Sequence, residues 1–96
     1  DKLTISSATN DAIEVFGITK IYVDTSSNNV SIGGFTNGQK GQVIHIIKDN
    51  TLNSLIIEYR EETGNQDIVI EGSSDKVITD YGVVVLVCNG TCWVCS

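Results

Sequence analysis

Apolar residues recur mainly at every second position of this chain, in short stretches separated by clusters of Gly, Asn, Asp and Ser. Leu3 and Ile5 alternate with polar neighbours, and Ile21 and Val23 repeat the pattern. A period of two is typical of a β-strand that turns one face toward a core. The rhythm of strands and turn residues predicts an all-β fold of roughly eight or nine short antiparallel strands.

The run 83–88, Val-Val-Val-Leu-Val-Cys, departs from this alternation because every residue in it is apolar. A chain of 96 residues has little interior in which to cover both faces of such a strand. We therefore expect one face to pack inside the subunit and the other to pack against another subunit. This predicts a β-sandwich or β-prism assembled as an intertwined homotrimer.

A second strongly β-branched strand is predicted just after the polar loop 36–41. Ile44 and Ile46 lie on one of its faces, and Val43, His45 and Ile47 lie on the other. His45 is the one histidine in the chain, and we expect it to be packed or hydrogen-bonded. A threefold axis that gathered three copies of it into a metal or anion site is the alternative.

The charge balance narrows the possible partners. Twelve acidic and six basic residues give a net charge of −6, which disfavours nucleic-acid phosphates and anionic lipid. No apolar stretch is long enough to span a membrane. The chain contains no Met and begins at Asp1, so we expect a single β-domain over residues 1–96 that forms the C-terminal fragment of a longer fibrous protein.

The three cysteines lie close to the end of the chain, as Cys88-x3-Cys92-x2-Cys95. Radical enzymes hold an iron–sulfur cluster with this spacing, but on an α/β barrel that this sequence cannot form. A two-residue turn after Cys88 would place Cys92 on the opposite face from the other two sulfurs. A longer loop, 89–92, would pair Cys88 with Trp93 and put Cys92 at the tip as an oxidisable thiol. The two-residue turn predicts buried thiols or a contact between subunits, and the longer loop predicts an exposed Cys92. We expect no metal and no cofactor with either turn.

From Ile13 onward, the order of features resembles the small β-rich modules at the tips of phage tail fibres, tail spikes and related virion proteins. The similar segments are Ile-Tyr-Val-Asp-Thr at 21–25, Val-Ser-Ile-Gly-Gly at 30–34, Gly-Gln-Lys-Gly-Gln-Val-Ile-His-Ile at 38–46 and Val-Leu-Val-Cys-Asn-Gly-Thr-Cys-Trp at 85–93. The chain departs from those modules after Trp93, where Val94 and Cys95 replace a closing aromatic residue.

The resemblance implies a non-enzymatic homotrimer, on the virion and outside the cell, that attaches to host cell-surface polysaccharide or caps a fibre. Three shallow sites on one rigid unit would then multiply weak contacts. The alternatives are a monomeric carbohydrate-binding module of a secreted bacterial protein, a trimerisation cap without a ligand, and a polysaccharide depolymerase.

Ligand-binding candidates lie in the polar loops and in the aromatic residues that border them. They are Asn37, Gln39, Lys40, Tyr59, Glu61, Glu62, Asn65 and Tyr81. The carboxylates around the loop 61–66 could also form a glycosidase pair or a calcium site. We interpret them as a solvated loop and assign no catalytic or metal-binding residue. Trp93 is expected in the core.

Overall fold

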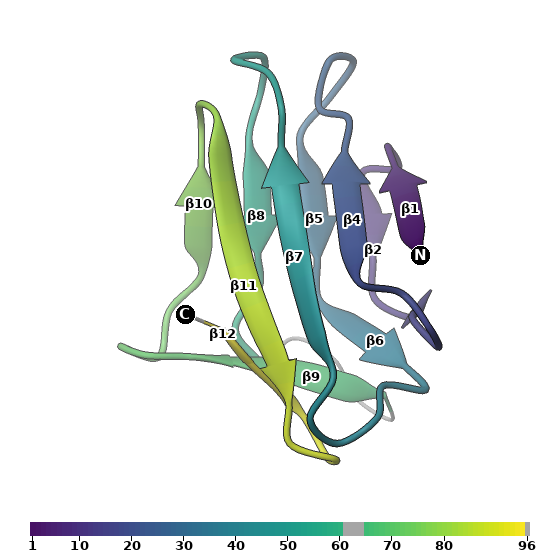
Figure 1. Ribbon diagram of the computed structural model, residues 1–96. Helices are drawn as coiled ribbons and strands as arrows, with labels where there is room; N and C mark the ends of the chain where they lie inside the picture. Colours follow the sequence, from purple (N-terminus) through teal and green to yellow (C-terminus); the bar gives the residue numbers. More distant parts are fainter. Residues whose placement is uncertain (61–64, 96) are drawn as a thin grey trace.

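The computed structural model describes residues 1–60 and 65–95, and these form twelve β-strands and no helix (Figure 1). The all-β prediction is therefore confirmed, with more strands than expected because several are only two or three residues long. The strands are β1 (Lys2–Ile5), β2 (Thr9–Asn10), β3 (Ile13–Glu14), β4 (Lys20–Val23), β5 (Val30–Ile32), β6 (Gly34–Thr36), β7 (Val43–Lys48), β8 (Leu55–Ile57), β9 (Gln66–Ile70), β10 (Lys76–Ile78), β11 (Gly82–Cys88) and β12 (Trp93–Cys95).

The strands stack in three columns, an arrangement that resembles a β-solenoid. Stack A contains β1, β4, β7 and β11, stack B contains β2, β5, β8 and β10, and stack C contains β3, β6, β9 and β12. In Figure 1 stack A lies in front, stack B lies behind it, and β6 and β9 cross below. One passage of the chain through the three stacks is called a rung; β1 to β3 form the first rung and β4 to β6 the second.

The chain reverses its winding between β8 and β9. Up to β8 it visits the stacks in the order A, B, C, so that strands one rung apart run parallel. From β9 onward it visits C, B, A and C, and β9, β10 and β11 lie antiparallel to β6, β8 and β7. The reversed segment closes one end of the solenoid, and the hairpin of β11 and β12 joins stack A to stack C.

This topology corrects the expectation of an antiparallel fold. Among the described residues, six strand pairings are parallel and four are antiparallel. Period-two alternation reports that one strand face is buried, but it carries no information about the direction of the neighbouring strand. Most of the turns that the sequence predicts are corners between stacks.

The core runs along the centre of the three stacks. In stack A the register aligns the inward residues Leu3, Ile21, Ile46 and Val84. The last three are no more than 1% exposed, whereas Leu3 in the first rung is half-buried. Trp93 of stack C is fully buried, as predicted, and packs against Phe35 with ring centroids 5.1 Å apart.

The closing hairpin uses the longer of the two predicted turns. Cys88 pairs with Trp93 across the loop 89–92, so the two-residue turn is wrong. Cys88 and Cys95 are buried, and Cys92 lies half-exposed in the loop. The amide N–H of Gly90 donates to Cys88 Sγ at 3.4 Å, which helps to fix this loop.

One side chain fastens the corner before β7 to the closing hairpin. Gln66 Oε1 accepts hydrogen bonds from the N–H of Gly38 at 2.8 Å and from Trp93 Nε1 at 3.2 Å. Gln66 Nε2 in turn donates to the carbonyl of Gly38 at 3.0 Å. Because a Cβ on Gly38 would collide with the Trp93 ring, only glycine allows this close approach.

Candidate functional site

A row of four valines crosses the outer surface of four neighbouring strands. The register aligns Val43 of β7 with Val87 of β11, Val87 with Val94 of β12, and Val94 with Val69 of β9. Val43, Val87 and Val94 are 40%, 41% and 48% exposed, and Val69 is half-buried. Since the opposite strand faces fill the core, these side chains contribute little to the interior of the subunit.

The same surface continues along β7 and β11. Val83 lies opposite Ile47 and Val85 lies opposite His45, and Val83 is 59% exposed. We call this surface the valine face; it consists of Val43, Ile47, Val69, Val83, Val85, Val87 and Val94. Contiguous exposed apolar surface of this kind is uncommon on monomers and marks contact sites.

His45 projects from the middle of the valine face and is exposed. The expectation that His45 is packed is wrong, because its side chain lies on the exposed, outward side of β7. Whether it is hydrogen-bonded stays a prediction. Ile44 and Ile46 share one face of the strand, as predicted, and that face is the buried one. Whether copies of His45 meet on an axis stays a prediction.

The strands that precede the valine face in stack A are polar on their outer side. β1 presents Lys2 and Thr4, and β4 presents Lys20 and Tyr22, in register with His45 and Ile47 of β7. Lys2 Nζ lies 5.7 Å from the centroid of the Tyr22 ring. The valine face therefore ends at the boundary between β7 and β4.

Three of the sequence-predicted ligand residues lie together in the corner between β6 and β7. Asn37, Gln39 and Lys40 are all exposed there. The Asn37 backbone is left-handed, with φ of 62°, and its side-chain amide donates to the Glu14 carboxylate. Gln42 supports the corner by donating from Nε2 to the carbonyls of Val15 and Ile18. Their role as ligand residues stays a prediction.

The other predicted ligand residues lie elsewhere. Tyr59 is half-buried against the core, and its pKa is lowered by hydrogen bonds from Ser73 and Arg60. Tyr81 is 67% exposed and precedes β11, at the opposite end of stack A from the corner between β6 and β7 (Figure 1). Asn65 is exposed, and Glu61 and Glu62 lie outside the described residues.

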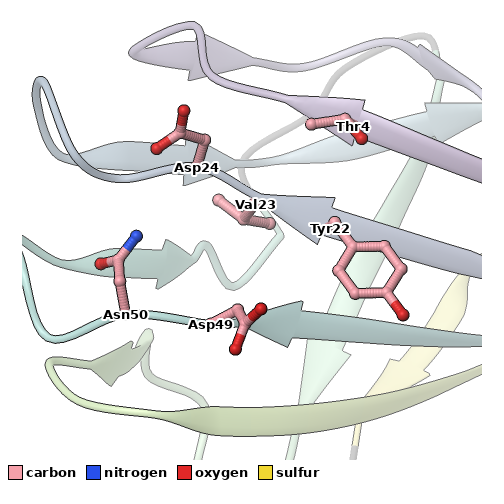
Figure 2. Close-up of a pocket in the computed structure, with 6 residues that line it drawn as sticks. All are labelled: Thr4, Tyr22, Val23, Asp24, Asp49 and Asn50. Atoms are coloured by element: carbon pink, nitrogen blue, oxygen red, sulfur yellow. The ribbon is translucent and has the colours of Figure 1, made fainter.

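A shallow hollow of about 230 Å³ lies at the carboxyl ends of three parallel strands in stack A (Figure 2). Thr4, Tyr22, Val23, Asp24, Asp49 and Asn50 line it. The Asp24 carboxylate accepts the N–H of Ser26, and hydrogen bonds from Ser26 lower its pKa. Asn50 Oδ1 accepts from the buried Lys48, which fixes the amide at the rim.

Sequence reasoning missed this hollow. The signal in the sequence was an Asp directly after each of two strands of stack A, as Val23-Asp24 and Lys48-Asp49. The parallel register of β4 and β7 brings these two Asp residues into neighbouring positions. That signal is readable only once the strands are known to be parallel. The aromatic ring of Tyr22 and the two carboxylates could contact a ligand rich in hydroxyl groups.

A second hollow, of about 390 Å³, lies beside Phe16, which sequence reasoning also missed. Phe16 is 70% exposed in a tight turn closed by the N–H of Ile18 donating to the carbonyl of Val15. The Glu14 carboxylate accepts the N–H of Phe16 at 2.9 Å, which lowers the Glu14 pKa together with the Asn37 amide. Lys40 and Gln39 form the opposite wall.

Residues 1–60 and 65–95 gather no three His, Cys, Asp or Glu side chains in a position to hold a metal ion. Cys88, Cys92 and Cys95 are not joined by a disulfide. Within the same residues there is no helix of the length and apolarity needed to cross a membrane.

Comparison with known proteins identifies no relative. No family model, no curated protein and no solved structure matches this chain.

Proposed function

We propose that this chain is the tip module of a virion tail fibre or tail spike, assembled as a homotrimer outside the cell, and that it works without catalysis. The module attaches the particle to host cell-surface polysaccharide or caps the fibre. The valine face, buried between copies, holds the assembly together.

The in-register valine row is the observation that carries this proposal. Side chains of equal size across β7, β11, β12 and β9 make a flat, uncharged strip. A flat β-branched surface is complementary to another of the same kind, because both can exclude water along their whole length. With a net charge of −6, copies of the chain approach each other best where neither carries an acidic side chain.

Attachment would follow from the rigidity of the assembled unit. Asn37, Gln39 and Lys40 form one exposed polar corner in each subunit. Three copies of a weak saccharide contact, held at fixed spacing, raise the overall affinity without any new contact. Hydroxyl-rich ligands suit shallow sites of this kind because amide and ammonium groups can exchange hydrogen bonds with water for hydrogen bonds with sugar.

Sedimentation equilibrium tests the assembly. We expect the wild-type chain to sediment at three times its 10.3 kDa mass, and Val87→Glu to sediment as a single chain because the carboxylate would be buried between subunits. Thr4→Glu, on the polar side of stack A, is the matched control and should leave the mass unchanged. Trp93 fluorescence reports whether each variant is folded.

A wild-type chain that sediments alone at all concentrations would contradict the assembly. It would favour the second candidate, a monomeric carbohydrate-binding module of a secreted bacterial protein. The hollow at Tyr22 is the observation that supports this candidate, since an aromatic ring beside two carboxylates is suited to a sugar. Titration of neutral oligosaccharides, with Tyr22→Ala compared with Tyr81→Ala, tests it: only the Tyr22 variant should lose binding.

A glycan array separates attachment from capping. If the wild-type trimer binds no polysaccharide of any candidate host surface, the ligand-free trimerisation cap is favoured. Binding that is lost with Lys40→Ala but retained with Lys76→Ala would place the site at the corner between β6 and β7.

A further inference from the structure

The two ends of the solenoid differ in whether the edges of their strands are hydrogen-bonded to a neighbouring strand. At the closed end, β11 and β12 have hydrogen-bonded neighbours on both edges. At the other end lie β1, β2 and β3, each of which pairs on one edge only among the described residues. All three strands of the first rung therefore expose an edge on the same side of the molecule, which we call the open end.

The backbone at the open end is in the conformation that accepts another strand. The carbonyl of Ile5 accepts the N–H of Asp24 at 2.8 Å, and the carbonyl of Ala8 accepts the N–H of Ser31 at 2.9 Å. In a parallel ladder, alternate residues direct their N–H and C=O groups to opposite sides. The groups of Lys2, Thr4 and Thr9 consequently point away from the second rung, and an exposed edge of this kind is a template for pairing.

The core is also incomplete at the open end. Leu3 and Ile5 are half-buried, whereas Ile21 and Val23, which occupy the same inward positions one rung further, are 0% and 3% exposed. A layer of apolar side chains above the first rung would bury Leu3 and Ile5 to the same extent. Each such burial stabilises the fold in proportion to the apolar area removed from water.

We propose that the open end is a docking surface for a further solenoid rung, three strands parallel to β1, β2 and β3, supplied by a preceding segment of a longer fibre polypeptide. The inference rests on the proposed function in taking this chain as the end module of a fibre. A preceding rung repeats the parallel contact already made between β1 and β4, β2 and β5, and β3 and β6.

A second copy of the chain fits this surface less well. Its closed end offers no strand of stack A or stack C with an open edge next to β11 or β12. Its own open end could approach only with its strands in the opposite direction, which would replace parallel pairing by antiparallel pairing. The charge of −6 on each copy would also oppose the approach.

An added rung tests the proposal directly. The extended chain carries an extra copy of residues 20–43 before Asp1. Lys2 aligns with Lys20 and Lys20 with His45, so a copy ending at Val43 leaves Asp1 at the position of Ile44 and keeps the rung in phase. The N–H of His45 bonds to Thr19 and the N–H of Glu58 bonds to Ile32, so in β4 and β5 the alternate residues that include Ile21 and Ile32 face the following rung. The matched control therefore carries the same extension with Ile21→Pro and Ile32→Pro in the added copy, because proline removes the backbone donors that pairing requires.

Hydrogen exchange and thermal unfolding give the readouts. We expect the Thr4 and Thr9 amides to exchange at least about tenfold more slowly in the extended chain than in the proline control. The unfolding midpoint should rise by roughly 5 °C, a shift of the size expected when a small domain gains one additional set of contacts. Equal exchange rates and equal midpoints in the two extended chains would overturn the proposal.

A second outcome would also overturn it. If the Thr4 and Thr9 amides of the unextended chain become protected as its concentration rises, another copy already occupies the open end. The sedimentation test with Val87→Glu concerns a different surface, so failure of the trimer and failure of the added rung can be told apart.

Discussion

The two halves of stack A have the same inner side and different outer sides. The aligned inward positions Leu3, Ile21, Ile46 and Val84 are aliphatic in all four strands. Outward positions are polar or aromatic in β1 and β4 but β-branched and apolar in β7 and β11, with the exception of His45. The change occurs between neighbouring strands of one sheet.

This contrast shows that the fold of one subunit requires apolar residues on the inner side of stack A but not on its outer side. A solenoid strand needs one apolar face, and β1 and β4 show that a polar outer face is compatible with the stack. The outer valines of β7 and β11 are therefore surplus to the fold of one subunit. Exposed apolar surface is costly in water, and the assembly that we propose would cover it.

The largest expected effect compares the two sides of β7. Ile46→Ala removes a fully buried side chain and should lower the free energy of unfolding by about 2–5 kcal/mol. Ile47→Ala, on the valine face, should cost about 1 kcal/mol or less in a single subunit. Chemical denaturation monitored by Trp93 fluorescence measures both.

Protein concentration then sharpens the comparison. If the valine face is buried between copies, the cost of Ile47→Ala should grow with concentration, because association stabilises only the wild-type assembly fully. The cost of Ile46→Ala should not change with it. A concentration-independent cost for Ile47→Ala would break the link between the outer valines and assembly.

A second pair of variants tests how tightly the closed end is packed. Gly38→Ala should destabilise the fold by about 1–3 kcal/mol, because the added Cβ meets the buried Trp93 ring and lies 2.6 Å from Gln66 Oε1. Gly82→Ala meets only the Ile78 side chain, with Cγ2 at 2.8 Å, and that half-buried chain can rotate away. In thermal unfolding, the midpoint of Gly38→Ala should be well below the midpoint of Gly82→Ala.

Strand faces could be predicted from the sequence, whereas strand partners could not. Alternation in Lys20–Val23 correctly gave the inward residues, and in Val43–Lys48 it correctly separated the two faces, since burial acts on each strand separately. The direction of pairing depends on where the chain goes at each corner. The reversal between β8 and β9 has no local signature in the sequence. The alternation of apolar and polar residues therefore could not predict which strands pair in parallel.

The candidate sites show the same limit. The apolar run 83–88 correctly indicated a strand with one face in the core of the subunit, and the packing of its other face against another subunit stays a prediction. The Asp24 and Asp49 hollow could not be predicted, because it is created by register between strands that are distant in sequence. Phe16 was overlooked because one aromatic residue next to Val15 looks like core until the turn at Gly17 directs it outward.

Acid should weaken the polar corner of the molecule through Glu14. Hydrogen bonds from the Phe16 N–H, the Asn37 amide and the Thr36 hydroxyl lower its pKa in the folded state. A lowered folded pKa gives stability that is present above the unfolded value and is lost as pH falls through the folded value. The unfolding midpoint of the wild type should therefore fall more between pH 7 and pH 3 than that of Glu14→Gln.

Asp24→Asn provides the comparison for this effect, because the Asp24 pKa is lowered in the same direction by Ser26 alone. Glu14 joins the turn at Phe16 to the corner at Thr36 and Asn37, whereas Asp24 bonds within one turn, so Glu14→Gln should flatten the pH dependence more. Equal slopes for the wild type and Glu14→Gln would show that this carboxylate does not hold the corner together. Both groups are exposed, and the effect should be small.

The smallest effect concerns the cysteines of the closing hairpin. The reaction rate of the half-exposed thiol can be compared with the rates of the two buried thiols without changing the stability of the fold. Cys92 is half-exposed in the loop 89–92, while Cys88 and Cys95 are buried and burial raises the pKa of the Cys95 thiol. A thiol-specific reagent under native conditions should modify one site, at least about tenfold faster than the others, since reaction needs both access and thiolate. Mass spectrometry after digestion identifies that site, and Cys92→Ser should abolish the fast phase.

Fast labelling of Cys88 instead would mean that the hairpin opens in solution. The buried side chains of Leu86, Cys88 and Trp93 could not then serve as a fixed support beneath the valine face.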